Sequence, residues 1–105
     1  MKVILYVDDL RMPTYWENKN YKIYVARTYK DAINMLNTIK IDIIDLDHDL
    51  GEEKSGYDIM KYIIENEIYI PEINIHTMNP VGKQNIIQLA SRYMKNSMII
   101  DYWHL

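Results

Sequence analysis

The stretch Met1–Arg11, with the sequence MKVILYVDDLR, decides the fold because a run of apolar residues leads directly into charged ones. Residues 3–7 are continuously apolar and rich in β-branched side chains, which is typical of a strand buried on both faces. Further runs of this kind follow at 23–26, 43–46 and 73–76, and a weaker one at 98–100. The sequence therefore predicts a sheet of four or five strands.

Helical patterns lie between these strands. Apolar residues recur at helical spacing over 28–40, 55–66 and 82–95. The first two stretches open with a hydroxyl residue, Thr28 or Ser55, followed three positions later by an aspartate, as in a capping box. Strands that alternate with helices predict βαβ units and a parallel sheet, an α/β fold.

The connection after the first strand departs from this pattern. Residues 10–21 contain Pro13 and have no helical period. We therefore expect a loop or a single helical turn in place of the first crossover helix. No linker or repeat divides the chain, and residues 1–105 are expected to form one domain.

Composition excludes several classes of function. The 105 residues carry a net charge of −3 and no cysteine, which leaves out disulfides, thiolate metal sites and cysteine nucleophiles. A negative chain is not expected to grip an extended nucleic-acid backbone, which requires a basic face. The sequence has neither a signal peptide nor the ~20 apolar residues of a membrane span, so we expect a cytoplasmic protein without a membrane partner.

Charged and polar residues gather where the predicted strands end. In an open parallel sheet, ligands bind at the carboxyl ends of the strands, near the point where strand order reverses. The second strand is expected to bring no titratable group to this edge. The other long strands end in Asp8, Asp9 and Arg11, in Asp47, His48 and Asp49, and in His76, Thr77 and Asn79.

Negative charge is concentrated in one segment. Residues 42–58 hold seven acids against one lysine, a net −6, so the rest of the chain is +3. Carboxylates brought together raise one another's pKa or recruit a cation. A hard divalent ion such as Mg²⁺, held by one to three carboxylates and water, would relieve the repulsion.

Structural explanations compete with these functional ones. Asp8 and Asp9 would merely cap or turn the chain, the histidines would be ordinary hydrogen-bonded residues, and Arg11 would lie on the surface. Asp45 falls inside a buried strand, where a carboxylate is costly unless it bonds the backbone or a hydroxyl.

Residues 76–83, HTMNPVGK, combine a strand end, a polar turn and a helix start. Backbone N–H groups and the helix dipole receive anions in such arrangements. Arg11, in the loop after the first strand, would hold a phosphate with its two-pronged guanidinium. The predicted phosphate-binding residues are Arg11, Thr77, Asn79 and Gly82.

These residues resemble a known family. An acid pair ends the first strand, Asp47 ends the third and leads through a loop with Gly56 into a helix, and the hydroxyl of Thr77 ends the fourth. This pattern resembles the receiver domains of two-component response regulators. The resemblance implies a flavodoxin-like three-layer sandwich and a magnesium pocket made by Asp8, Asp9 and Asp47, with Asp47 as the phospho-accepting residue.

The chain also departs from ordinary receivers. The first crossover helix is short or missing, the last helix is absent, and no lysine follows the fifth strand. Arg11, the DHDLG segment at 47–51 and the HTMNPVG segment at 76–82 make the chain similar to cyclic-phosphate-processing receiver domains. That resemblance implies a phosphoesterase that opens a cyclic phosphate on a 2′,3′-cyclic RNA end or a cyclic nucleotide, with a divalent ion as cofactor.

The resemblance and the chemistry together assign roles. The predicted catalytic residues are His48, His76, Arg11 and Asp49, and the predicted metal ligands are Asp8, Asp9 and Asp47. The two histidines are the candidates for acid and base, in an order that the sequence leaves open. Asp49 either orients His48 or replaces Asp8 as a ligand, and a metal-free scheme with two histidines and Arg11 is the alternative.

Two further functions compete with the phosphoesterase. One is a receiver-derived module that binds a phosphate or a protein without turnover, which the missing lysine favours. The other is a true phospho-receiver. A shared site requires that Asp9, Arg11, Asp47, His48 and His76 line one open pocket.

Overall fold

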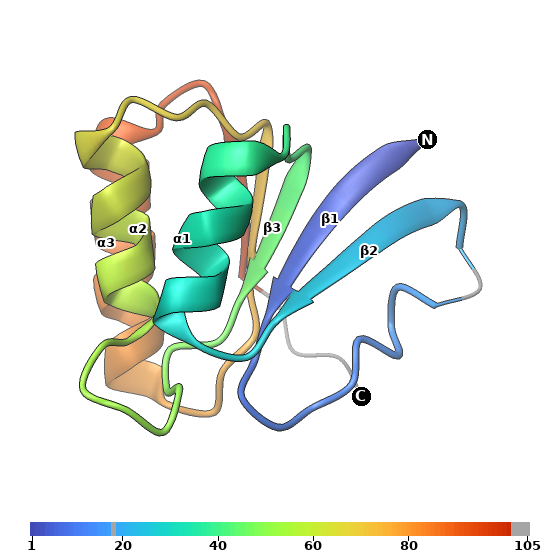
Figure 1. The fold of residues 1–105 in the computed structure, drawn as a ribbon. Coiled ribbons are helices and arrows are strands. Elements are labelled where there is room, and N and C mark those ends of the chain that lie inside the picture. Colours follow the sequence, from blue (N-terminus) through green and yellow to red (C-terminus); the bar gives the residue numbers. More distant parts are fainter. Residues whose placement is uncertain (18, 102–105) are drawn as a thin grey trace.

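The computed structural model describes residues 1–17 and 19–101, and its elements follow the predicted order (Figure 1). The strands are β1 (Lys2–Val7), β2 (Tyr21–Ala26), β3 (Ile43–Leu46), β4 (Glu72–Ile75) and β5 (Met98–Asp101). The helices are α1 (Tyr29–Thr38), α2 (Gly56–Glu65) and α3 (Pro80–Tyr93). All strand pairs are parallel, in the order β2-β1-β3-β4-β5. This strand order is the flavodoxin-like one, so the predicted fold class is confirmed.

Strand order places the helices on one face of the sheet. The connection from β1 leads to one edge, whereas every later connection leads toward the other. Because parallel crossovers are right-handed, α1, α2 and α3 lie together on one face, and the segment between β1 and β2 crosses the opposite face (Figure 1). The described residues of that segment, 8–17 and 19–20, form a short turn at Pro13 and no helix, as predicted.

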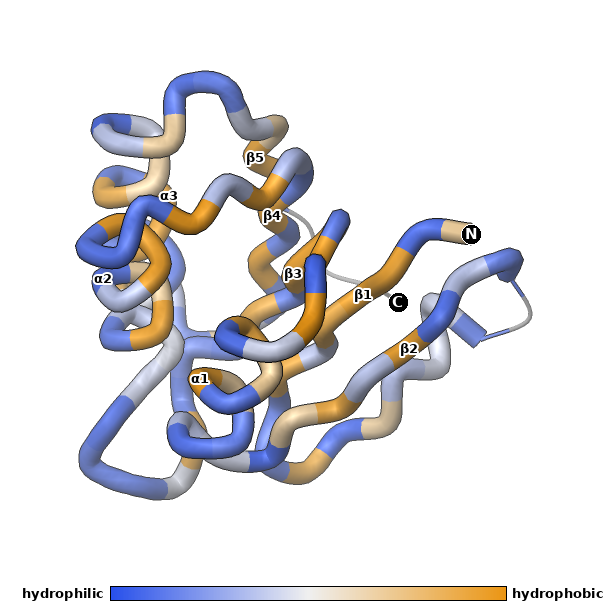
Figure 2. Tube along the Cα trace, turned by 45° about the horizontal axis from the view of Figure 1, so that its top comes forward, coloured by the Kyte–Doolittle hydropathy of each residue, from blue (hydrophilic) through white to orange (hydrophobic). Residues whose placement is uncertain are grey.

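Two apolar clusters follow from the alternation of side chains along the strands. Leu5 and Ile44 face the helices and belong to the main core, and their strands, β1 and β3, are largely orange in Figure 2. On the opposite face, Trp16 packs on Ile4 and Ile43 in a smaller cluster. The turn after β1 thus covers a part of the sheet that, in other parallel sheets, is usually covered by a crossover helix.

Helix starts agree with the predicted caps, with one shift. Ser55 and Asp58 form a complete capping box at α2, and the hydroxyl of Thr28 accepts from the N–H of Asp31 at α1. The third helix, predicted to begin near residue 82, begins two residues earlier. Asn79 caps α3 and Pro80 takes its first position, where the missing N–H costs nothing. None of the described helices has the length and apolar character needed to cross a membrane.

Gly56→Ala is expected to destabilise the protein by about 1–3 kcal/mol, because an added methyl group overpacks a tight contact. A Cβ at Gly56 would collide with the backbone carbonyl oxygen of Asp47. Urea unfolding measures the loss, and Lys61→Ala on the exposed side of the same helix is the control. Equal stability of Gly56→Ala and wild type would show that the backbone at Asp47 can shift without an energetic cost, and would contradict this prediction.

Candidate functional site

Asp8 and Asp47 follow β1 and β3, the neighbouring strands at which strand order reverses. The ladder continues one step beyond the strands, because the N–H of Asp47 donates to the carbonyl of Val7 at 3.0 Å. Both residues are buried, at 1% and 7% exposure. Two buried acids therefore lie at the place where parallel sheets bind ligands.

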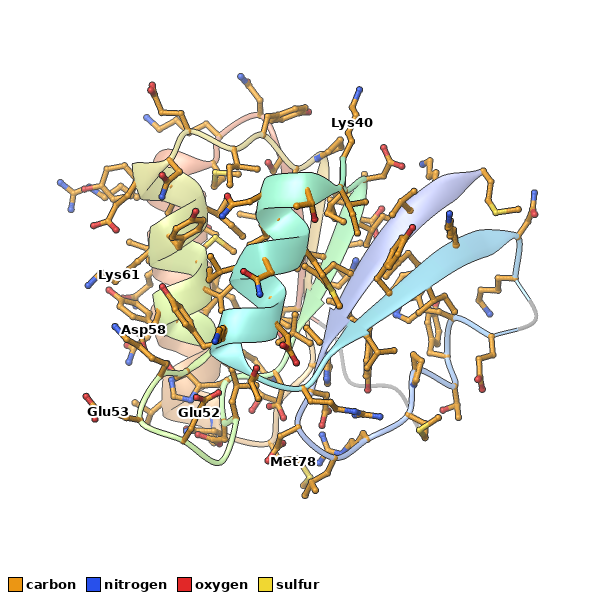
Figure 3. The ribbon with its side chains drawn as sticks, viewed as in Figure 1. Lys40, Glu52, Glu53, Asp58, Lys61 and Met78 are labelled. Carbon is orange, nitrogen blue, oxygen red and sulfur yellow. The ribbon has the colours of Figure 1, made fainter. Side chains whose placement is uncertain are left out.

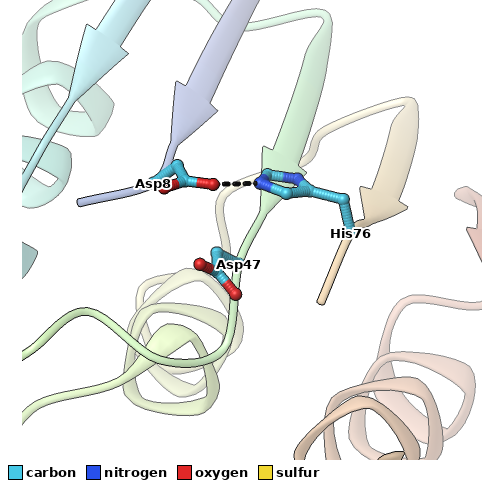
Figure 4. Close-up of side chains that lie close together, drawn as sticks. All are labelled: Asp8, Asp47 and His76. Atoms are coloured by element: carbon cyan, nitrogen blue, oxygen red, sulfur yellow. Dashed lines mark hydrogen bonds and ion pairs between the residues drawn. The ribbon is translucent and has the colours of Figure 1, made fainter. Parts of the chain in front are cut away.

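A buried hydrogen-bond network holds Asp8. His76, directly after β4, lies between two carboxylates. Its Nδ1 is 2.6 Å from Asp45 Oδ1. Its Nε2 is 2.9 Å from Asp8 Oδ2, the contact drawn in Figure 4. The other oxygen of Asp45 accepts from Trp16 Nε1 at 2.6 Å. The ring of Tyr6 stacks on His76 with 4.8 Å between centroids. The partners of buried Asp45 thus include an indole and an imidazole.

The network fixes the charge of His76. Ionised carboxylates only accept hydrogen bonds, so a histidine between two of them donates from both nitrogens and is cationic. Burial alone lowers the pKa of His76, but the bonds to Asp45 and Asp8 outweigh it and raise the pKa to about 9. The site carries a built-in cation at neutral pH.

Asp8 and Asp47 respond to this setting in opposite ways. Burial raises the pKa of Asp8. Hydrogen bonds from His76 and from the backbone N–H groups of Arg11 and Leu10 lower it by more than that, and the resulting pKa is about 2. Burial and the charge of Asp8 raise the pKa of Asp47, against weaker opposing effects from His76 and the Thr77 hydroxyl. Asp47 is therefore the carboxylate that a bound cation would relieve most.

In the absence of a divalent ion, stability should fall as pH rises above about 6.5. The folded chain raises the pKa of His76 from 6.5 to about 9, so the stabilisation is complete below the first value and lost as pH passes the second. A shift of this size is on the order of a few kcal/mol. Urea unfolding in EDTA across this range measures the loss.

The pH prediction has its own control. His76→Gln removes the titrating group, so its stability should change much less over the same range. An equally steep pH dependence in that variant would assign the effect to other groups. Asp8 adds a second loss at the acid end, as pH falls below 3.8 toward its lowered pKa of about 2.

An open cavity of about 360 Å³ lies above these acids. Gly51, with a φ of 68°, is on its wall. It lies so close to Asp9 that a Cβ at this position would be 2.9 Å from Asp9 Oδ2. The guanidinium of Arg11 approaches Asp8 at 3.9 Å from the same side. The residues that line the cavity are Asp8, Asp9, Leu10, Arg11, Asp47, Asp49, Gly51, Thr77 and Met78.

The two histidines do not line this cavity, so the expectation of one open pocket for all five residues is wrong for them. His76 is 3% exposed and is not among the residues that line the cavity. His48 faces the start of α3, because adjacent residues at a strand end point to opposite faces and Asp47 takes the cavity side. Its ring lies against Gly82, and its Nδ1 is 2.9 Å from Asp49 Oδ1.

Only part of the predicted phosphate-binding set reaches the cavity. Arg11 and Thr77 line it. The N–H of Gly82 donates to the side chain of Asn79 at 2.9 Å, as a helix cap. This N–H is therefore engaged within the chain, and the roles of Asn79 and Gly82 toward phosphate stay predictions.

Arg27 is a site residue that the sequence analysis missed. It follows β2 directly, so the expectation that this strand brings no titratable group is wrong. Its Nη1 donates to the carbonyls of Asp8 at 2.9 Å and Arg11 at 2.6 Å. Arg27 thus fixes the backbone of the loop that carries both residues.

The donors fit a hard divalent cation. Ligand atoms of Asp8, Asp47 and His76 all lie within 4.8 Å of one another (Figure 4). Both nitrogens of His76 are bonded to carboxylates, which leaves oxygen atoms as the natural ligands. Asp8 and Asp47, with Asp9 on the same cavity, form an oxygen-donor set of the kind that Mg²⁺ prefers.

Comparisons with known proteins bear on the family and the fold. The family model described as cyclic-phosphate processing receiver domain matches residues 3–92. Comparison with curated proteins gives no match.

Solved receiver domains share the fold. A Francisella response regulator receiver domain is 19% identical, with a TM-score of 0.73, over 96% of this chain and 84% of that one. A Clostridium difficile two-component response regulator is 20% identical, with a TM-score of 0.72, over 100% and 83%. The Thermotoga maritima response regulator TrrA, solved in complex with Mg²⁺ and BeF, is 21% identical, with a TM-score of 0.70, over 97% and 87%.

Proposed function

The chain belongs to the cyclic-phosphate processing receiver domain family, and we propose that it is a phosphoesterase that opens cyclic phosphates on 2′,3′-cyclic RNA ends or cyclic nucleotides. One observation carries the proposal. Buried acids at the strand-order reversal share a single cavity with Arg11 and Thr77. Anionic and cationic side chains side by side suit a metal-dependent phosphate site better than a surface that only docks a protein.

The reaction adds water across one bond of the ring. A new bond forms between phosphorus and the water oxygen, the bond from phosphorus to one ribose oxygen breaks, and a proton passes from water to that oxygen. Charge builds on the non-bridging phosphoryl oxygens as this happens. A divalent ion held by Asp8, Asp9 and Asp47 would neutralise that charge and lower the pKa of water.

Side chains at the cavity supply the remaining contacts. Arg11 is partly exposed and carries a planar, two-pronged guanidinium that matches phosphoryl oxygens. Arg27 keeps Arg11 in place through its backbone carbonyl. The hydroxyl of Thr77, which hydrogen-bonds to Asp47, lies at the same wall.

Proton transfer belongs to the pair of His48 and Asp49. Asp49 lines the cavity and is 2.9 Å from His48 Nδ1, so it orients the imidazole. His76 has both nitrogens bonded to buried carboxylates and touches no open space. We assign it the role of a positioning residue for Asp8.

A binding module without turnover is the second candidate. The observation that favours it is the placement of both histidines away from the cavity, which leaves carboxylates and no imidazole as proton acceptors among the residues that line it. Such a module would bind a cyclic phosphate and release it unchanged.

An activity assay of the purified protein with Mg²⁺ or Mn²⁺ distinguishes the phosphoesterase from the binding module. We expect ring opening of at least one of 2′,3′-cyclic nucleotides, 3′,5′-cyclic nucleotides and cyclic-phosphate RNA ends. Arg11→Ala should lower kcat/KM by on the order of 10²-fold, whereas Arg92→Ala, an exposed arginine of α3, should leave it unchanged. Binding seen as a thermal shift with no product would support the module, and the enzyme would then be ruled out.

A further inference from the structure

A second, smaller cavity adjoins the acidic one. It has a volume of about 190 Å³ and is lined by Thr77, Met78, Pro80 and Lys83. Thr77 and Met78 line both cavities. A ligand whose phosphate reaches the acids can therefore extend past Thr77 into this second space.

Apolar side chains stand where the cavities meet. Met78 is 72% exposed, and Figure 3 shows it projecting away from the body of the molecule at the end of the sheet where β1 and β3 stop. Leu10, also exposed, lies on the wall of the acidic cavity. A flexible thioether next to a charged site is suited to pack on the flat face of a ring.

The charged group in the small cavity is already neutralised. Lys83, in the first turn of α3, has its Nζ 3.2 Å from Asp101 Oδ1. Asp101 is at the carboxyl end of β5, opposite Ile75 in register. An unpaired lysine would favour a second phosphate, whereas this ion pair favours a neutral group that accepts a hydrogen bond.

We propose that the small cavity is a base subsite, which receives the nucleobase of a nucleotide whose cyclic phosphate lies at the acids. Met78 packs on the face of the base, and Lys83 donates to an acceptor at its edge. The inference rests on the proposed function. The acidic cavity of about 360 Å³ falls within the ~300–1,000 Å³ of small-molecule sites, and the adjoining cavity adds about 190 Å³ to it.

The test compares substrates with and without a base. Nucleoside 2′,3′-cyclic phosphates and methyl riboside 2′,3′-cyclic phosphate differ only in that group. We expect the base to raise kcat/KM by about tenfold or more, in line with apolar contacts in a binding pocket. Equal values for the two substrates would overturn the base subsite and leave the phosphoesterase intact.

Two variants locate the effect. Met78→Ser should lower kcat/KM for the nucleotide several-fold and leave the base-free substrate unchanged. Val81→Ser is the matched control, because Val81 is 71% exposed nearby and lines neither cavity. Lys83→Gln should likewise affect only the nucleotide. Equal losses on both substrates, or an effect of Val81→Ser as large as that of Met78→Ser, would contradict the assignment.

A binding measurement keeps the inference testable if no substrate is opened. Calorimetry with Mg²⁺ then compares nucleoside 3′-monophosphate with ribose 3-phosphate. Tighter binding of the nucleotide, lost in Met78→Ser, supports the base subsite although the phosphoesterase has failed. Equal binding of the two ligands, or binding of neither, overturns the subsite as well.

Discussion

Asp47→Asn should abolish ring opening and leave the fold at least as stable as wild type. Asp47 is buried, and both burial and the charge of Asp8 raise its pKa. Its carboxylate is therefore unfavourable in the fold unless a cation binds. An asparagine removes that charge and the repulsion with it, while it also removes an oxygen ligand of the divalent ion.

The two effects are measured separately. Loss of kcat/KM is expected to be on the order of 10²-fold or more, because electrostatic stabilisation of the transition state depends on this group. Calorimetric titration with Mg²⁺ should show weaker binding, and urea unfolding in EDTA should show equal or higher stability.

A control variant shows whether the loss of any negative charge from this segment would have the same effects as Asp47→Asn. Glu53→Gln removes one charge from the same acidic segment at an exposed loop position (Figure 3) and should change neither property. Turnover in Asp47→Asn at the wild-type rate would contradict the assigned role. Lower stability in EDTA would contradict the electrostatic account of this residue.

His76→Gln should cause the largest loss of stability of any single change in the network, about 3–5 kcal/mol at neutral pH. The substitution removes the cation between Asp8 and Asp45, both almost fully buried. Two desolvated carboxylates then lack their counter-charge. Urea unfolding in EDTA measures the effect.

A double-mutant cycle keeps this prediction testable even if His76→Gln alone folds poorly. Asp45→Asn removes one of the two buried carboxylate charges that His76→Gln leaves without a counter-charge. The double variant Asp45→Asn/His76→Gln should therefore lose much less stability than the sum of the two single losses. Additive losses would show that His76 and Asp45 do not act as a pair.

The convergence of Asp8, Asp47 and Thr77 could be predicted from the sequence because parallel strands deliver their carboxyl ends to one edge. The orientation of His48 was also within reach, since a residue adjacent to Asp47 must point to the opposite face. The start of α3 was signalled by Asn79 and Pro80.

Other features could not be predicted in this way. The contact of Trp16 with Asp45 joins positions 29 residues apart, and that of His76 with Asp8 spans 68. Neither pair has a local spacing that would reveal it. The sequence identified a buried carboxylate in need of a partner, but which side chain supplies it depends on how the turn after β1 folds over the sheet.

Phosphorus NMR of a 2′,3′-cyclic nucleotide with the purified protein and Mg²⁺ tests the central claim most directly. The proposed function predicts that the resonance of the cyclic phosphate decays and a monoester resonance grows in its place, with wild type and not with Asp47→Asn or in EDTA. A cyclic resonance that persists unchanged with wild-type protein, or one that decays equally with Asp47→Asn, would contradict it.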